Sequence, residues 1–165
     1  MSKRQKEEFE CLVKDILDNK EFQKLENELH HGITRYSHSM RVAKATYNTT
    51  KALGLDYKEA TRAALLHDFF LDNQFSKKEG KKKFSTHPQI AVENAKKYYE
   101  LSEKQENIIE SHMFPANLTV PKSAEAWTVS LMDKSVAAYE MYRFKFSLVI
   151  NIWAIFLFNL ITLQK

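Results

Sequence analysis

Four histidines of this 165-residue chain lie in four separate segments, each near a predicted helix end or a neighbouring loop. Two aspartates accompany them: Asp68 directly follows His67, and Asp133 lies in an otherwise largely apolar stretch. Neutral imidazole and carboxylate both bind divalent first-row metals well, and a buried carboxylate is costly unless it is paired or bound to a metal. The candidate metal site has six members: His38, His67, Asp68, His87, His112 and Asp133.

Each of these residues also has an ordinary structural explanation. A single histidine is more often a hydrogen-bonded polar residue than a ligand, and a His-Asp dipeptide alone is weak evidence for a metal. The competing hypothesis is an all-helical domain with incidental histidines, and it predicts an exposed Asp133 and scattered imidazoles. The combined pattern is what favours a metal site.

The elements that must position these side chains are predicted to be helices. Three glycines and three prolines are few for this length, which favours helices joined by short loops and an all-α fold. We find no convincing strand, and we interpret the polar residues 71–86 as a loop. Apolar residues at helical spacing predict helices over 4–18, 20–29, 34–53, 56–67, 88–100, 102–112 and 123–142.

Local signals mark several ends of these helices. The predicted N-caps are Thr34, Asp56 and Ser102. After the last two, Glu59 and Gln105 lie three residues later and complete the capping-box pattern. Gly32 and Gly54 are placed as helix stops.

Composition limits the class of protein. With 44% apolar residues the chain can bury a core, and its formal net charge of +4 is too modest to predict a specific nucleic-acid partner. The single cysteine, Cys11, cannot form an internal disulfide, and the charged residues 1–10 predict no signal peptide. We therefore expect a cytoplasmic protein. Five lysines between residues 77 and 83 form either a solvated loop or a rim that steers phosphate.

The C-terminal segment differs from the rest of the chain. Residues 146–164 carry no charge and are apolar on all faces, and a transmembrane helix needs at least about 17 such residues. Three interpretations remain open for 146–163: a membrane anchor, a homodimer interface and a packed helix. Under the first, Arg143 and Lys145 would keep the preceding domain in the cytoplasm.

Several segments resemble the HD superfamily of metal-dependent phosphohydrolases. Residues 35–43 (RYSHSMRVA) look like the first-histidine helix of the family, 63–68 (AALLHD) like its signature, and 131–134 (LMDK) like its closing aspartate. Residues 86–91 (THPQIA) and 110–113 (ESHM) look like the extra histidine motifs of subgroups that hold two metals. The resemblance covers about residues 30–140.

The resemblance implies a compact helical bundle of the HD type with an apolar C-terminal helix. Its expected organisation is an N-terminal helical segment at 1–29, an HD domain at 30–143 and an apolar helix or tail at 144–165. By carry-over, one metal is held by His38, His67 and Asp133 and a second by His87 and His112, with Asp68 bridging the two.

The resemblance also implies the chemistry. His67 and Asp68 would be the catalytic pair, two ions of Mn, Fe, Co or Ni the cofactors, and a hydroxide bridging them the nucleophile. The expected substrate is a phosphate ester or anhydride of a nucleotide or another small phosphorylated molecule. Arg35 and Lys134 either contact that substrate or serve as ion-pair partners. The alternative function is a non-catalytic HD module that binds a metal or nucleotide for regulation.

Overall fold

The structure, a computed structural model, describes residues 1–30, 32–75 and 83–163, with side chains described over 1–29, 32–75 and 86–147. The predicted all-α fold is confirmed. Its helices are α1 (Lys3–Leu17), α2 (Lys20–Gln23), α3 (Arg35–Ala52), α4 (Tyr57–Leu66), α5 (Lys83–Lys96), α6 (Glu103–Ser111) and α7 (Ala124–Leu163). Among the described residues there are also two 3₁₀ turns, η1 (Lys24–Asn27) and η2 (Asp72–Gln74), and a hairpin of β1 (Leu29–His30) and β2 (Ile33–Thr34).

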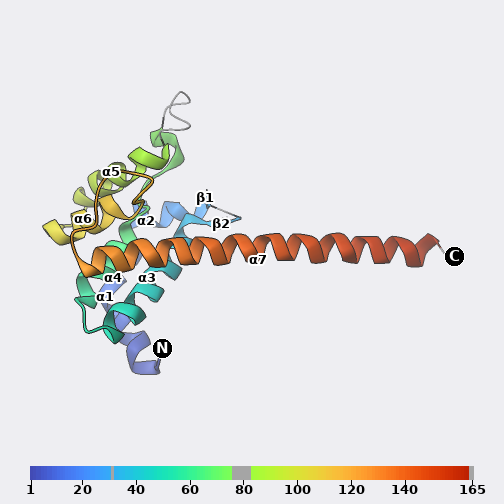
Figure 1. Ribbon diagram of the computed structural model, residues 1–165, viewed down its shortest axis with the longest axis horizontal. Helices are drawn as coiled ribbons and strands as arrows, with labels where there is room; N and C mark the ends of the chain where they lie inside the picture. Colours follow the sequence, from blue (N-terminus) through green and yellow to red (C-terminus); the bar gives the residue numbers. More distant parts are fainter. Residues whose placement is uncertain (31, 76–82, 164–165) are drawn as a thin grey trace.

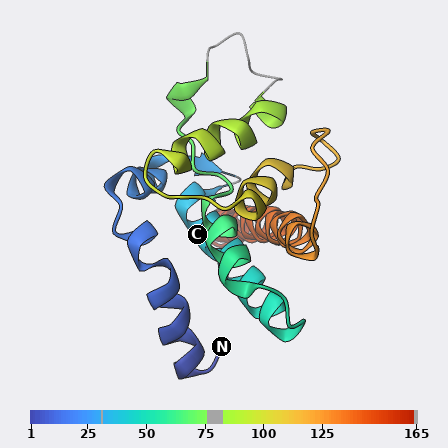
Figure 2. The same cartoon turned by 90° about the vertical axis from the view of Figure 1, so that its left-hand side faces the viewer.

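Helices α3 and α4 form the centre of the bundle (Figures 1 and 2). Helix α7 packs on α3, α6 packs on both α4 and α7, and α5 packs mainly on α6. Three alanines of α4, Ala60, Ala63 and Ala64, are fully buried, and their small side chains let α4 approach its neighbours closely. The larger buried side chains of this core are Phe9, Val13, Ile16, Phe22, Leu25, Val42, Tyr47, Leu65, Leu66, Ile108, Ile109 and Val129.

The predicted cap of α6 is confirmed, whereas the capping box of α4 forms only in part. Ser102 accepts from the Gln105 amide, and the Gln105 side chain accepts from the Ser102 amide. Asp56 likewise accepts from the Glu59 amide at 3.2 Å. The Asp56 amide, however, donates to Glu125 of α7 at 3.0 Å, so a tertiary contact replaces the local bond in which Glu59 would accept from this amide.

The segment before α3 differs from the prediction of one helix over 20–29 followed by a helix stop. Helix α2 and turn η1 end at Asn27, and Leu29 then pairs antiparallel with Thr34, so the prediction of no strand is wrong. Strands of two residues are too short to show alternation in the sequence. Gly32 lies beside this pairing with φ of +85°, and a Cβ there would lie 2.5 Å from the Phe144 ring. Glycine therefore allows α7 to pack against the hairpin.

Helix α5 begins before the position predicted from the sequence. It starts at Lys83 and ends at Lys96, so His87 lies inside the helix and Pro88 follows it there. Proline is favoured in the first helical turn, where its missing N–H has no partner within the helix, but Pro88 lies beyond that turn and was therefore a misleading marker of the helix start. The predicted loop over 71–86 contains η2 and the start of α5. Residues 76–82, with most of the lysine cluster, lie outside the described residues.

Helix α7 joins two segments that the sequence analysis treated separately. Between Ala124 and Leu163 there is no glycine or proline, and the helix continues through 143 and beyond the body of the molecule (Figure 1). Within the part of the chain that was described, no helix is long and apolar enough to span a membrane. The proposed membrane or dimer contact at 146–163 lies mostly outside the residues with described side chains.

Candidate metal centre

The structure brings all six predicted residues together where α3, α4, α5, α6 and α7 meet. His38 lies in the first turn of α3, His67 and Asp68 follow α4, and the others come from α5, the end of α6 and α7. All six are buried. Three overlapping groups have ligand atoms within 4.8 Å of one another: His38, His67 and Asp68; His67, His112 and Asp133; and Asp68, His87 and His112. The hypothesis of scattered histidines with an exposed Asp133 is therefore wrong.

Two of the histidines are oriented by the helix ends on which they lie. His67 is the C-cap of α4 and His112 is the C-cap of α6. The Nδ1 of His67 lies 2.8 Å from the Ala64 carbonyl oxygen, and that of His112 lies 2.7 Å from the Ile109 carbonyl oxygen. Because a carbonyl only accepts, each Nδ1 donates, and each satisfies a carbonyl of the last helical turn. The Nε2 atoms are thereby left to face the centre, where they could bind a metal.

His38 is held from both sides by carboxylates of α7. Its Nε2 lies 3.0 Å from Asp133 Oδ1, and its Nδ1 lies 2.8 Å from Glu140 Oε2. Both carboxylates can only accept, so in the metal-free protein both nitrogens donate. Burial alone would lower the pKa of His38, but these two hydrogen bonds raise it to about 10.

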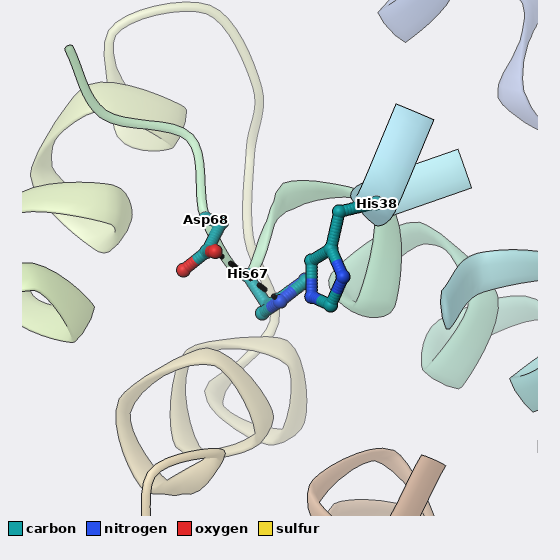
Figure 3. Close-up of side chains that lie close together, drawn as sticks. All are labelled: His38, His67 and Asp68. Carbon is teal, nitrogen blue, oxygen red and sulfur yellow. Dashed lines mark ion pairs between the residues drawn. The ribbon is translucent and has the colours of Figure 1, made fainter. Parts of the chain in front are cut away.

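Asp68 faces two different groups of imidazoles. Its Oδ2 lies 3.7 Å from His67 Nε2, whereas its Oδ1 lies 3.3 Å from His87 Nε2 and 3.7 Å from His112 Nε2. Figure 3 shows Asp68 beside His67, with the ring of His38 on the far side of His67. The two oxygens of the Asp68 carboxylate thus face different imidazoles: Oδ2 faces His67, and Oδ1 faces His87 and His112.

The electrostatics of the centre prepare Asp133 and His112 for a cation, whereas neighbouring carboxylates raise the pKa values of His38 and His67, whose protons an ion must displace. Burial would raise the pKa of Asp133, but His38 and His67 hold it well below its usual range, so this carboxylate is charged. Burial, together with the charge of His67, lowers the pKa of His112 to about 3. His112 is therefore neutral near pH 7, and its Nε2 lone pair is available.

One atom tests whether these residues fit a metal. His67 Nε2 is buried and has no hydrogen-bond partner among the described residues, and it lies 3.6 Å from Asp133 Oδ1 and 3.7 Å from Asp68 Oδ2. An unsatisfied buried polar atom costs about 1–3 kcal/mol, and a cation at this point would remove that cost. The donors are nitrogen and oxygen without thiolate, which suits divalent transition metals. The residues fit a metal ion.

Comparison with protein families gives the same assignment. Residues 35–138 match the family model described as HD domain. This chain belongs to the HD domain family. HD proteins form a superfamily of metal-dependent phosphohydrolases, and the buried His and Asp groups of this HD domain fit its metal site. A search of curated proteins and a search of solved structures gave no match.

Arg35, predicted to contact substrate or to form an ion pair, is 2% exposed in this HD domain. Its Nη1 donates to the Phe70 carbonyl at 3.0 Å and its Nη2 to Asp72 at 3.0 Å, and Glu28 lies 3.4 Å away. The guanidinium also lies 3.9 Å from the centre of the Phe70 ring. These contacts favour the ion-pair interpretation, in which Arg35 fixes the segment that follows Asp68.

Lys134 is also engaged inside the HD domain. Its Nζ donates to the His112 carbonyl at 2.8 Å, to Ser130 Oγ at 2.7 Å and to the Ser130 carbonyl at 3.2 Å. A lysine has three N–H donors, so all three are used. Burial lowers the pKa of Lys134. This arrangement favours a structural role, in which Lys134 holds the main chain at His112.

Glu140 is a residue of the centre that was not predicted from the sequence. Its side chain is fully buried, and it contacts both His38 and Arg41. The signal was present in the spacing, because Glu140 follows Asp133 by seven residues, or two helical turns, and so lies on the same face of α7. Its neighbours Tyr139 and Met141 are exposed, and this pattern was visible only once the helix was placed.

Replacing Arg35 tests whether this residue is an ion-pair partner or a substrate contact. Arg35→Ala is expected to lower the free energy of unfolding by about 2–3 kcal/mol, because it removes the hydrogen bonds of a buried charged group. Chemical denaturation measures this value, and Arg143→Ala, at an exposed position, is the control with an expected change within about 0.5 kcal/mol. A variant as stable as the wild type but with a raised KM for a phosphorylated substrate would instead assign Arg35 to substrate binding.

Proposed function

We propose that this HD domain hydrolyses a phosphate ester or anhydride of a small phosphorylated molecule, with a nucleotide as the first candidate. The observation that carries the proposal is the position of Asp68, whose two oxygens face separate imidazole groups. A carboxylate in that position is suited to contact two cations at once. Two ions are therefore favoured over one.

The donors divide naturally between the two ions. His38, His67 and Asp133 would hold the first, since their ligand atoms meet on the side of α3 and α7. His87 and His112 would hold the second, since their Nε2 atoms lie 3.0 Å apart. Mn, Fe, Co and Ni all accept this mixture of nitrogen and oxygen donors.

The residues of the chain supply positioning and charge. When bound, a pair of divalent ions supplies an activated water and clamps the phosphate oxygens. The carboxylates of Asp68 and Asp133 offset part of the ions' charge, and the buried surroundings exclude competing water. The helix-end hydrogen bonds of His67 and His112 keep their donor atoms in place.

Metal content tests the binuclear site. Elemental analysis of metal-replete protein, purified without a His-tag, is expected to give two ions per chain. His87→Ala is expected to lose one ion, because it removes a donor of one group only, whereas His67→Ala is expected to affect the other ion. If the wild type binds one ion and His87→Ala still binds it, the site is mononuclear and His87 and His112 are not ligands.

The two ions are expected to respond differently to pH. Below its pKa of about 10, His38 carries a proton that an ion must displace, so the affinity of that ion rises with pH. Between pH 6 and 8 the rise is about tenfold per pH unit for each displaced proton. His112, with a pKa of about 3, has no proton to lose in this range. Chelator competition measures both affinities, and a flat profile for both ions would contradict this assignment.

Hydrolysis is the direct test of the proposed activity. Metal-replete protein is expected to turn over at least one compound in a panel of phosphomonoesters, phosphodiesters and nucleotides. A chelator is expected to abolish turnover because it removes the ions. The Asp68→Asn variant is expected to abolish turnover because it removes the carboxylate that both ions share. Two bound ions with no turnover on the whole panel would instead support the regulatory HD module.

A further inference from the structure

Glu140 contributes a buried carboxylate that the six-residue set does not include. It lies on α7, and its side chain is fully buried against α3. One oxygen, Oε2, lies 2.8 Å from His38 Nδ1, and the other, Oε1, accepts from Arg41 Nη1 at 3.0 Å. Both oxygens are therefore directed to α3, on which His38 and Arg41 lie three residues apart.

We propose that Glu140 is a positioning residue of the metal centre, which acts by fixing the ring of His38. The inference rests on the proposed function, because it assumes an ion at His38 Nε2. An imidazole presents one nitrogen to a metal, and its other N–H commonly donates to a carboxylate that sets the tautomer and the ring orientation. The observed bond from Nδ1 to Glu140 meets this requirement.

The two carboxylates on His38 have different roles when an ion is present. Asp133 lies on the Nε2 side, where it would itself become a ligand and no longer hold the ring by a hydrogen bond. Glu140 lies on the Nδ1 side, away from the centre, and its bond to the ring persists. Glu140 therefore holds the His38 ring in the metal-bound state, in which the orientation of the ring decides metal affinity.

Arg41 completes this arrangement from the solvent side. Its side chain is 48% exposed, whereas that of Glu140 is 0% exposed. An unpaired carboxylate at this depth would be costly, and the charge-assisted bond from Arg41 offsets that cost. Burial would raise the pKa of Glu140, but its contacts with His38 and Arg41 hold it below the usual range. A surface ion pair alone would not require the second oxygen to face His38.

The experiment compares metal binding by three variants of the 165-residue chain. Glu140→Ala removes the acceptor, and Glu140→Gln keeps an oxygen of similar reach but removes the charge. The matched control is Glu125→Ala, since Glu125 is another buried glutamate of α7, whose carboxylate accepts from the Asp56 amide and lies 3.9 Å from Lys104. Affinity for Mn²⁺ and Co²⁺ is measured by chelator competition, stoichiometry by elemental analysis, and folding by thermal unfolding of the metal-free proteins.

The expected result is selective loss of one ion. Glu140→Ala weakens the ion at His38 by about 10- to 100-fold, the range found for such outer partners, and leaves the ion at His87 and His112 in place. Glu140→Gln weakens the same ion by a smaller factor and changes the Co²⁺ absorption spectrum less. Glu125→Ala lowers thermal stability without changing either affinity. A purely structural role of Glu140 would instead give the pattern of Glu125→Ala.

Each other outcome overturns a defined part of the argument. If the wild type binds two ions and both Glu140 variants bind them equally well, the positioning role is wrong and the proposed function stands. If the wild type binds no ion, both the proposed function and this inference fail. If Glu140→Ala does not fold, Glu140→Gln decides, and wild-type affinity for both ions in that variant overturns the positioning role.

Discussion

Burial of carboxylates in a helical core is the constraint on which this structure depends. Asp68, Asp133 and Glu140 are all nearly inaccessible, and isolated charges at such depth would destabilise the fold strongly. Each of them faces an imidazole at 2.8–3.3 Å. The helices that carry these groups must therefore converge, so the packing of α3, α4, α5, α6 and α7 and the assembly of the centre are one requirement.

Secondary structure itself determines which atoms face the centre. A helix ends with carbonyl oxygens that lack partners, and His67 and His112 each satisfy one through Nδ1. The hydrogen bond from Nδ1 at the helix end thus sets the tautomer of each of these histidines and leaves Nε2 as the atom that could bind a metal. His38 lies at the start of α3 instead, where no such carbonyl is available, and the Glu140 carboxylate of α7 performs this role at Nδ1.

A surrounding set of polar residues keeps the centre in place. Arg35 binds the segment after Asp68, and Lys134 binds the carbonyl of His112. Sequence analysis left both residues with two interpretations, because a cation beside a ligand motif is equally suited to a substrate phosphate or to a protein carbonyl. Internal contacts engage both terminal nitrogens of Arg35 and the ammonium group of Lys134, which directs the search for phosphate-binding groups to other residues.

The sequence by itself determined the helical class, most helix positions and the family, because helical periodicity, caps and the His-Asp motifs are local patterns. It also named all six residues that meet at the centre. Only the tertiary structure decided that His87 lies within a helix, that Asp56 bonds to Glu125, and that Glu140 contacts His38. The last two features are contacts between residues far apart in the chain, and no local pattern encodes which distant partner a polar group will meet.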